Sequence, residues 1–353
     1  MLNDLELYSE VDQGGMAKLL MQFYQQFDTG VELARKVDLT AFAGYEIYNI
    51  LLCGMGGSAI GGDLLRAYLF DELPIPMYIN RDYDIPGFVD EHTLVIGSSY
   101  SGNTEESISS FMKAKDRGAL LFAISTGGKL IGIANSLGVP YLKIPSGLPP
   151  RAALGYSFIP LLGVFIRLGY ARDHWADIKS TARLLKNRAE KFSPSVPDNP
   201  AKKLATRIFG KLPLIYSSTR YFDVVGTRFR GQINENAKML AYSSLLPEMN
   251  HNELVGWKHL FEFGKQLVPV FLTDKDDNPR VRYRMELTSD IMRRLGVEPI
   301  FLESQGESLL ERIFSLIQLG DFASYYLAIL AREDPRPVKI IDYLKTRLKE
   351  FKG

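Results

Sequence analysis

Short apolar runs alternate with longer segments of helical spacing along the first half of the chain. The apolar runs have strand length and predict β-strands at residues 47–53, 76–80, 93–97, 119–125 and 141–145. Between them, apolar residues recur every three or four positions, which predicts helices at residues 58–70, 104–116 and 129–137. This alternation predicts a mostly parallel sheet with helices on both faces, and such sheets bind ligands at the carboxyl ends of their strands.

A stretch rich in proline and glycine at residues 145–156 interrupts this rhythm, and helical patterns follow it at 158–170 and 175–192. A connection of this kind between two series of elements indicates two α/β units. We therefore predict a first unit over residues 1–155 and a second over residues 156–353.

A second series of strands and helices fills the rest of the chain. Strands are predicted at residues 212–218, 267–273 and 298–304, with helices between and after them, including residues 307–331. The final segment, PVKIIDYLKTRLKEF, has the pattern of an amphipathic C-terminal helix. Its basic residues are those of an ordinary solvated helix face.

The composition and net charge are those of an ordinary globular protein. The 353 residues are 46% hydrophobic and 24% charged with a formal net charge of +1, so bulk charge points to no nucleic-acid or membrane partner. The only cysteine, Cys53, ends a predicted strand, and we expect a buried, inert thiol there. No signal peptide is visible, and the apolar stretch at 158–166 is too short to span a bilayer. These features favour a cytoplasmic location.

A glycine-rich turn joins the first predicted strand to the first predicted helix. Gly54, Gly56 and Gly57 leave the backbone bare, and the N–H groups of a helix N-terminus form an anion site. Ser58 could cap the helix and also contact the anion. The turn is equally consistent with a tight connection that only lets the helix pack closely on the sheet.

A second loop, SSYSGNTEES, follows the strand at 93–97 and concentrates hydroxyl groups in one turn. Hydroxyl and backbone N–H groups together can form a concave nest for an anion. Helix capping would explain Thr104 but not Ser99 and Ser101. Two such loops at the ends of neighbouring strands favour a sugar-phosphate ligand.

Other phosphate motifs fit this chain less well. No lysine follows Gly56 or Gly57, as a P-loop would require. Gly54, Gly56 and Ala59 match a relaxed dinucleotide fingerprint, with Asp82 or Asp84 as its acidic residue. The serine- and threonine-rich loop has no role in a dinucleotide site, however, so the NAD hypothesis stays a minor alternative.

The two loops resemble the sugar isomerase (SIS) domain, which binds phosphosugars. The whole chain resembles the bifunctional phosphoglucose/phosphomannose isomerase family. The segments that carry this resemblance are GMGGSAIGGD (54–63), SSYSGNTEES (98–107), STGGKL (125–130), PSGLPPRAALGY (145–156), GQINENAKMLA (231–241) and PEMNHNELVGW (247–257). It implies two SIS-type, flavodoxin-like αβα sandwich domains with mostly parallel sheets, plus the C-terminal helix.

The resemblance also implies a reaction, the reversible conversion of glucose 6-phosphate, and of mannose 6-phosphate, to fructose 6-phosphate. This aldose–ketose isomerisation opens the sugar ring and moves a proton between C1 and C2 through a cis-enediolate. A carboxylate can carry the proton, so we expect neither a metal nor a redox cofactor. The residues implied to bind the phosphate are Gly56, Gly57, Ser58, Ser99, Ser101 and Thr104.

Four further residues receive catalytic roles from the resemblance. Glu235, set among uncharged polar neighbours, is the implied proton-transfer base, although most helix glutamates are merely solvated. Arg151 is implied to face the enediolate oxygens, where a loop arginine would otherwise lie at the surface. His251 is implied to assist ring opening across the interface of a homodimer. Lys345, or else Lys339, is implied to reach the site from the C-terminal helix.

Glu253 is the alternative base, and His92, His174 and His259 are expected to be structural. A phosphosugar sensor would keep the two loops without needing Glu235, His251 and Arg151. Another SIS enzyme is a further alternative. An amidotransferase of the glucosamine-6-phosphate synthase type needs an N-terminal domain with a cysteine nucleophile, and since the sequence starts MLNDLELYS and Cys53 lies in a predicted strand, we do not expect this type.

Overall fold

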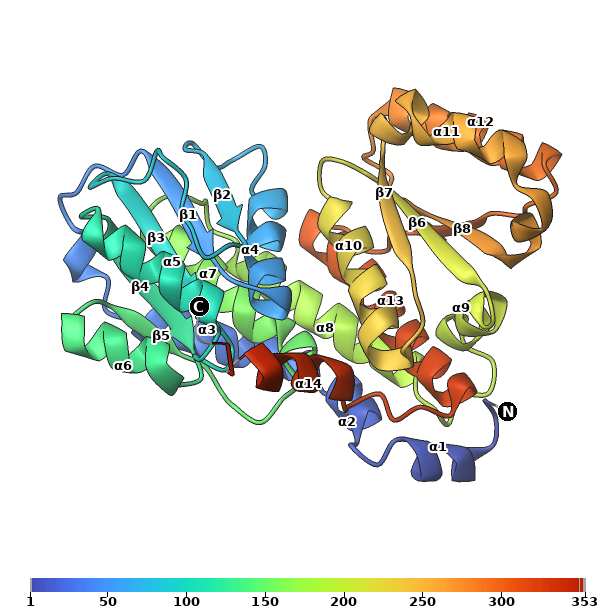
Figure 1. Cartoon of the computed structure of the whole chain (residues 1–353), viewed down its shortest axis with the longest axis horizontal. Helices are drawn as coiled ribbons and strands as arrows, with labels where there is room; N and C mark the ends of the chain where they lie inside the picture. The colour runs from blue at the N-terminus through green and yellow to red at the C-terminus, as the bar shows by residue number, and fades with distance from the viewer. Residues whose placement is uncertain (1, 349, 352–353) are drawn as a thin grey trace.

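Two parallel sheets, each between layers of helices, make up the computed structural model, which describes residues 2–348 and 350–351 (Figure 1). The first sheet has the strand order β2-β1-β3-β4-β5, and all four of its strand pairs are parallel. This order is the flavodoxin-like order, whose switch point lies between β1 and β3. The strands are β1 (Asn49–Cys53), β2 (Met77–Asn80), β3 (Thr93–Ser98), β4 (Leu120–Ser125) and β5 (Tyr141–Lys143).

The second sheet repeats the beginning of this order with β7-β6-β8-β9, again with parallel pairs throughout. Its strands are β6 (Leu212–Ser218), β7 (Tyr242–Leu246), β8 (Leu267–Thr273) and β9 (Ile300–Glu303). The expected fold of two flavodoxin-like αβα units is therefore confirmed.

Alternation along β1 explains how helices cover both faces of the first sheet. Leu51 and Cys53 pack with α5 and α6, whereas Ile50 and Leu52 pack on the opposite face. The helices of this unit are α3 (Gln25–Lys36), α4 (Gly56–Tyr68), α5 (Glu105–Asp116), α6 (Gly128–Leu137) and α7 (Leu154–Arg167).

The helix α13 (Leu309–Ala331) forms the core of the second unit. By length and composition it could cross a membrane, but 89% of its apolar window is buried within the fold. Ser308 and Glu311 form a capping box that fixes its start. The other helices of this unit are α8 (Trp175–Lys191), α9 (Pro200–Ile208), α10 (Asp223–Gln232), α11 (Glu253–Gly256) and α12 (Pro279–Arg294).

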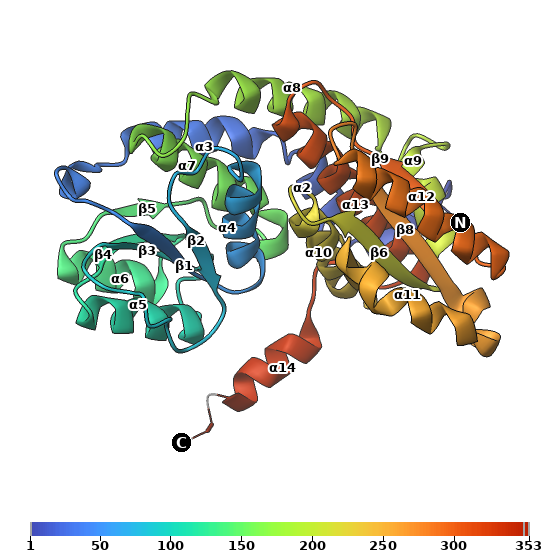
Figure 2. The same ribbon diagram turned by 90° about the horizontal axis from the view of Figure 1, so that it is seen from above.

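The two units share one hydrophobic core. The N-terminal helices α1 (Leu5–Val11) and α2 (Met16–Met21) pack on α13, and α8 runs across both units (Figure 2). The largest apolar cluster contains residues of both sheets, such as Leu52 and Ile215. The division of the chain at residue 155 stays a prediction, and this position lies in the first turn of α7.

The predicted strands are confirmed, with ends that differ by at most two residues from those of the structure. The helix predicted at 158–170 begins earlier, at Leu154, because the short turn Pro150–Ala152 leads directly into it and Pro160 is accommodated inside it. The strand β7 and the helices α1 to α3 were not predicted. Adjacent serines and partial exposure hide β7, whose residues other than Leu246 are not fully buried.

Candidate active site

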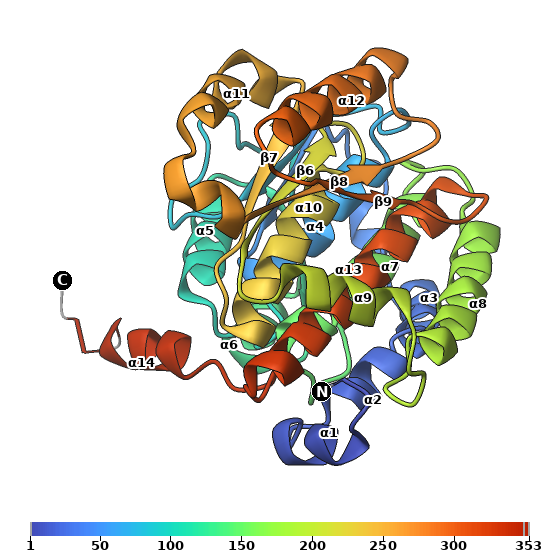
Figure 3. The ribbon, with the colours of Figure 1, turned by 90° about the vertical axis from the view of Figure 1, so that its right-hand side faces the viewer.

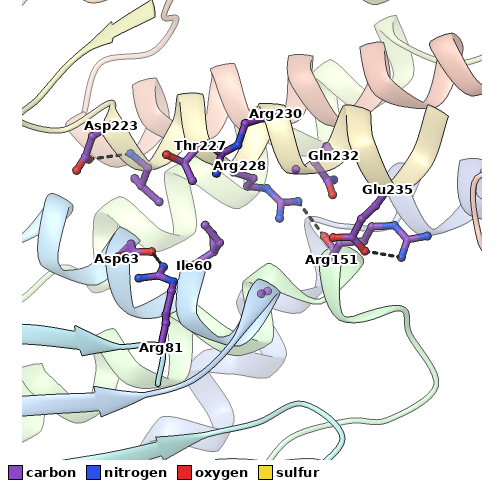
Figure 4. A pocket seen from close by; sticks show the side chains of 14 residues that line it. Ile60, Asp63, Arg81, Arg151, Asp223, Thr227, Arg228, Arg230, Gln232 and Glu235 are labelled. Carbon is purple, nitrogen blue, oxygen red and sulfur yellow. Dashed lines mark hydrogen bonds and ion pairs between the residues drawn. The ribbon is translucent and has the colours of Figure 1, made fainter. Parts of the chain in front are cut away.

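A cavity of about 430 Å³ opens between α4 of the first unit and α10 of the second (Figure 4). Gly56 and Gly57 line it from the start of α4, next to the loop that carries Arg151, and Arg151 and Glu235 line the same end. The salt bridge between Arg81 and Asp63 lies at the α4 side, away from Glu235. The cavity thus places a helix N-terminus and a carboxylate–guanidinium pair around one space.

Arg151 is almost fully buried, with 5% of its side chain exposed, and its guanidinium is held on several sides. Its Nη1 donates to Glu235 Oε2 at 3.2 Å, and its Nε donates to Asn236 Oδ1 at 2.7 Å. Burial lowers the pKa of Arg151, and the nearby Glu235 carboxylate opposes this shift. The guanidinium is therefore a fixed cation at the wall of the cavity.

Glu235 lies in a short π-helix that directly follows α10, where the helical turn is wider than in an α-helix. Residues Ile233–Ala237 form a π-helix, and Lys238 closes it with a left-handed backbone at φ 55°. Single π-helical turns of this kind occur often at functional sites. The widening leaves the Glu235 side chain 35% exposed toward the cavity, next to Arg151 (Figure 4). A carboxylate about one-third exposed at the cavity, beside a buried cation, suits a group that exchanges protons with a ligand.

A buried network of polar side chains lies next to the Arg151–Glu235 pair and bonds to the Arg151 backbone. Arg228 Nη2 donates to Asp321 Oδ2 at 2.7 Å and to the Arg151 carbonyl at 2.9 Å, and Gln232 Nε2 donates to Asp321 Oδ1 at 2.7 Å. Burial raises the pKa of Asp321, and Arg228 opposes that shift. Sequence reasoning missed Asp321, although an aspartate inside the apolar run LIQLGDFASYYL was a usable signal.

The glycine loop serves both close packing and exposure of the backbone. A Cβ on Gly57 would lie 2.8 Å from the Pro150 carbonyl oxygen, so this glycine lets α4 approach the loop that carries Arg151. Gly56 has φ +50° and open space around its Cα, and it lines the cavity. The tight-packing interpretation therefore holds for Gly57, while Gly56 leaves backbone bare at the cavity.

Ser58 does not cap α4, contrary to the expectation. The N-cap position is Met55, which makes no side-chain capping bond. Ser58 is buried, and its Oγ accepts a hydrogen bond from the Tyr100 N–H at 2.9 Å. This bond joins the glycine loop to the hydroxyl-rich loop, because a serine in the first helical turn faces the neighbouring loop rather than the helix end.

The hydroxyl-rich loop is folded on itself. Ser99 and Thr104 share a hydrogen bond of 2.8 Å between their hydroxyls, and Ser101 Oγ accepts from the Asn103 N–H at 3.2 Å. Thr104 occupies the N-cap position of α5 without making the capping bond. The cavity is lined by Gly56 and Gly57 but by none of the four hydroxyl residues proposed for the phosphate, Ser58, Ser99, Ser101 and Thr104.

Known proteins are similar to this chain over most of its length. The chain is 45% identical over 338 residues to a bifunctional phosphoglucose/phosphomannose isomerase of Caldicellulosiruptor bescii, covering 93% of this chain and 97% of that protein. It is 37% identical to the protein of that name from Aquifex aeolicus, covering 94% of this chain and 98% of that one. This chain belongs to the bifunctional phosphoglucose/phosphomannose isomerase family. It is accordingly an isomerase.

A family model agrees with this assignment, and one more distant relative carries a different name. The model of the bacterial phospho-glucose isomerase C-terminal SIS domain matches residues 197–348. Among relatives, a D-glucosamine-6-phosphate 4-epimerase of Sulfolobus acidocaldarius is 30% identical and covers 85% of this chain and 89% of its own.

Solved structures show the same fold at low sequence identity. A hypothetical protein of Thermus thermophilus gives a TM-score of 0.73 at 18% identity, over 99% of this chain and 93% of that one. Tagatose-6-phosphate ketose/aldose isomerase from Escherichia coli gives a TM-score of 0.68 at 14% identity, over 93% and 94%. The SIS-type fold expected for this family is therefore confirmed.

The family's other implied catalytic groups lie away from the cavity of the single chain. His251 is exposed at the end of the 3-10 turn Glu248–His251 and does not line the cavity. Glu253 accepts a hydrogen bond from Tyr216 Oη instead of facing the cavity, which argues against it as the base.

Lys339 and Lys345 belong to α14 (Lys339–Leu348), which has no buried residue and projects away from the body of the molecule (Figures 2 and 3). One chain therefore brings Glu235 and Arg151 together, but not His251 or either lysine.

Cys53, His174 and His92 lie in the surroundings expected of inert or structural residues. Cys53 is buried, and burial raises the pKa of its thiol to about 12. His174 is buried between Glu72 and Tyr68, at 2.9 Å from each, and His92 stacks on Tyr48. In the part of the chain that the structure describes, no group of three or more His, Cys, Asp or Glu side chains is arranged to hold a metal ion.

Proposed function

We propose that this protein interconverts glucose 6-phosphate and fructose 6-phosphate, and mannose 6-phosphate and fructose 6-phosphate. The observation that carries the proposal is the Glu235–Arg151 pair at the cavity, in a chain 45% identical to a protein named for both activities. The 4-epimerase relative is less similar, at 30% identity, so the isomerase reaction is favoured.

Glu235 is the base that moves the proton between C1 and C2. Its carboxylate is about one-third exposed at the cavity, within reach of a bound open-chain sugar. A positioned base of this kind contributes roughly 10²- to 10⁴-fold to a rate. Arg151 stabilises the negative charge that develops on the enediolate oxygens, because its guanidinium is already desolvated and held in place.

The phosphate binds at the start of α4. Gly56 and Gly57 present backbone there, and the partial positive charge of the helix N-terminus attracts the anion. The hydroxyls of Ser58, Ser99, Ser101 and Thr104 belong to the adjoining loop pair that the Ser58–Tyr100 hydrogen bond holds together. On ligand binding, the Ser99–Thr104 bond would be exchanged for bonds to phosphate oxygens.

The catalytic site is completed by a second copy of the chain in a homodimer. The exposure of His251 and of all of α14 leaves these groups accessible to a partner, which supports the proposal. His251 would then assist ring opening across the interface, and Lys345 would reach the site from α14. Such an enzyme would serve cytoplasmic sugar metabolism, in glycolysis and gluconeogenesis.

Both aldoses fit one mechanism because they differ only at C2. Loss of the C2 proton from either sugar gives the same enediolate. Fructose 6-phosphate formation should therefore be measured from glucose 6-phosphate and from mannose 6-phosphate separately, with a metal chelator present. We expect turnover of both sugars.

Turnover of glucose 6-phosphate alone would keep the mechanism and narrow the substrate range. Binding of fructose 6-phosphate without turnover of either aldose would instead favour a phosphosugar sensor and contradict the proposed function.

A further inference from the structure

Arg151 depends on a remote segment for half of its known hydrogen bonds. A guanidinium has five N–H donors, and four of those of Arg151 have partners. Both donors of Nη2 go to backbone carbonyls, that of Pro335 at 2.6 Å and that of Arg336 at 2.8 Å. These carbonyls belong to the connector, residues 332–338, which joins α13 to α14.

These two bonds decide which way the guanidinium faces. With Nη2 and Nε committed to the protein, the one donor that remains is on Nη1, beside Glu235. A rotation of the guanidinium would take these donors from the buried Pro335 carbonyl and the partly buried Arg336 carbonyl, which is costly. The position of the connector therefore fixes the position of the positive charge at the cavity.

Arg336 anchors the connector to two other segments. Its Nη1 donates to the Gly14 carbonyl at 2.8 Å and its Nη2 donates to the Gly147 carbonyl at 3.2 Å. Gly147 belongs to the loop that leads to Arg151, so Arg336 holds the connector against the segment that carries Arg151. Lys238, which closes the π-helix of Glu235, also donates to the connector, at the Asp334 carbonyl.

At Gly14 there is no room for a side chain, because the aliphatic part of the Arg336 side chain occupies that space. A Cβ added to Gly14 would lie 2.6 Å from both Cβ and Cδ of Arg336. Gly14 and Arg336, which lie 322 positions apart in sequence, therefore pack closely against each other.

We propose that Arg336 is a positioning residue for the isomerisation, which holds the connector so that the Pro335 and Arg336 carbonyls orient the Arg151 guanidinium toward the reacting carbons. This inference rests on the proposed function of Arg151. Arg336 itself does not line the cavity.

The first test is Arg336→Met, which keeps the stem and removes the guanidinium. We expect kcat for glucose 6-phosphate to fall about 10- to 100-fold, the scale of a small misplacement of a catalytic group. KM should change less than about threefold, because ground-state binding at α4 is untouched. Arg332→Met, at an exposed arginine of the same connector, is the control and should keep wild-type kcat.

A second readout separates positioning from general destabilisation. A five-carbon aldonate phosphate carries a planar carboxylate that resembles the enediolate, so a correctly oriented Arg151 should favour it. Calorimetry should show that Arg336→Met weakens binding of this analogue about tenfold or more, while binding of fructose 6-phosphate changes little. Equal weakening of both ligands, or a lower melting temperature with unchanged kcat, would overturn the proposal.

Gly14→Ala tests the same contact from the other side. It should displace Arg336 and lower kcat in the wild-type background, but add little in the Arg336→Met background, because the two residues act as one unit. If Gly14→Ala and Arg336→Met lower kcat by fully additive amounts, a shared role is contradicted.

If Arg336→Met lowers kcat in the wild-type background but not in a Lys345→Met background, the effect acts through α14, and the proposal is also overturned. A wild-type protein that turns over neither sugar, while the analogue still discriminates Arg336→Met, would overturn the proposed function but not this positioning.

Discussion

At the scale of single residues, the site depends on a buried arginine whose contacts are specific to its shape. Arg151 bonds to Glu235 and Asn236 and to two connector carbonyls, so its planar fork is matched to several acceptors at once. A lysine has a compact charge and cannot satisfy such a set. The charge at the cavity and its orientation are therefore both properties of arginine.

Arg151→Lys should consequently be a severe change. We expect kcat to fall roughly 10²- to 10³-fold, as for loss of a preorganised donor. Unsatisfied carbonyls should also lower the free energy of unfolding by about 1–3 kcal/mol. Steady-state kinetics and urea unfolding measure the two effects. Arg117→Lys, at an exposed arginine that donates to one carbonyl, is the control; a comparable loss there would contradict the account.

The family resemblance of the sequence motifs singled out Glu235 and Arg151, which lie 84 residues apart and meet in the structure. The motifs were not sufficient for the residues that hold Arg151. Its bonds to Pro335 and Arg336 use backbone carbonyls, which leave no mark on side-chain chemistry in the sequence. Contacts of this kind depend on how the chain folds back on itself, which local patterns do not report.

At the scale of elements, hydrophobic periodicity predicted the buried strands well because both of their faces are covered. β3 is buried at every position and was found almost to the residue. β7 lies at the edge of its sheet with partly exposed residues, so its apolar run is too weak to read. The start of α7 was missed because Pro149 and Pro150 resemble a connector but lead into a helix.

The contact between α4 and the Arg151 loop gives a prediction at this scale. Gly57→Ala would place a Cβ 2.8 Å from the Pro150 carbonyl oxygen, and backbone cannot yield as a flexible side chain can. We expect α4 to shift, with KM for fructose 6-phosphate raised about tenfold and about 1–3 kcal/mol of stability lost to overpacking. Kinetics and thermal unfolding measure both.

Gly132→Ala is the matched control, because it lies in α6 with open space around its Cα. Alanine should stabilise that helix by up to about 1 kcal/mol and leave KM unchanged. An unchanged KM in Gly57→Ala would contradict a phosphate site at the start of α4.

At the scale of the whole molecule, the cavity exists only because two units are held together. Arg66 of α4 pairs with Asp223 of α10 at 2.8 Å. Asp71, just after α4, accepts hydrogen bonds from Arg220 and Tyr221 of the second unit. The two units also share the large apolar cluster to which α13 belongs.

The Asp71 contact predicts a pH-dependent contribution to stability. Hydrogen bonds from Arg220 and then Tyr221 lower the pKa of Asp71. As the pH falls, the Asp71 carboxylate is protonated in the unfolded chain before it is protonated in the folded protein. The contribution of Asp71 to the free energy of unfolding is therefore complete above the ordinary aspartate pKa of about 3.9, and it is lost as the pH falls through the folded pKa. Asp71→Asn should therefore cost up to about 1 kcal/mol at pH 7, because the pair is half-exposed, and less at a pH of about 2.

Chemical unfolding of Asp71→Asn and wild type at both pH values measures this difference. Asp116→Asn, which changes an exposed contact within α5, should show little effect at either pH. A cost for Asp71→Asn that persists in acid would show that the contribution is not ionic.

The central claim is that Glu235 moves the proton, and Glu235→Gln tests it most directly. The amide keeps the size and the hydrogen-bonding oxygen of the side chain but cannot accept the proton. We predict that kcat falls about 10²- to 10⁴-fold for glucose 6-phosphate and mannose 6-phosphate alike, with KM nearly unchanged. Glu286→Gln, at an exposed glutamate of α12, should keep wild-type kcat. A Glu235→Gln enzyme whose kcat stays within tenfold of wild type on either sugar would contradict the account.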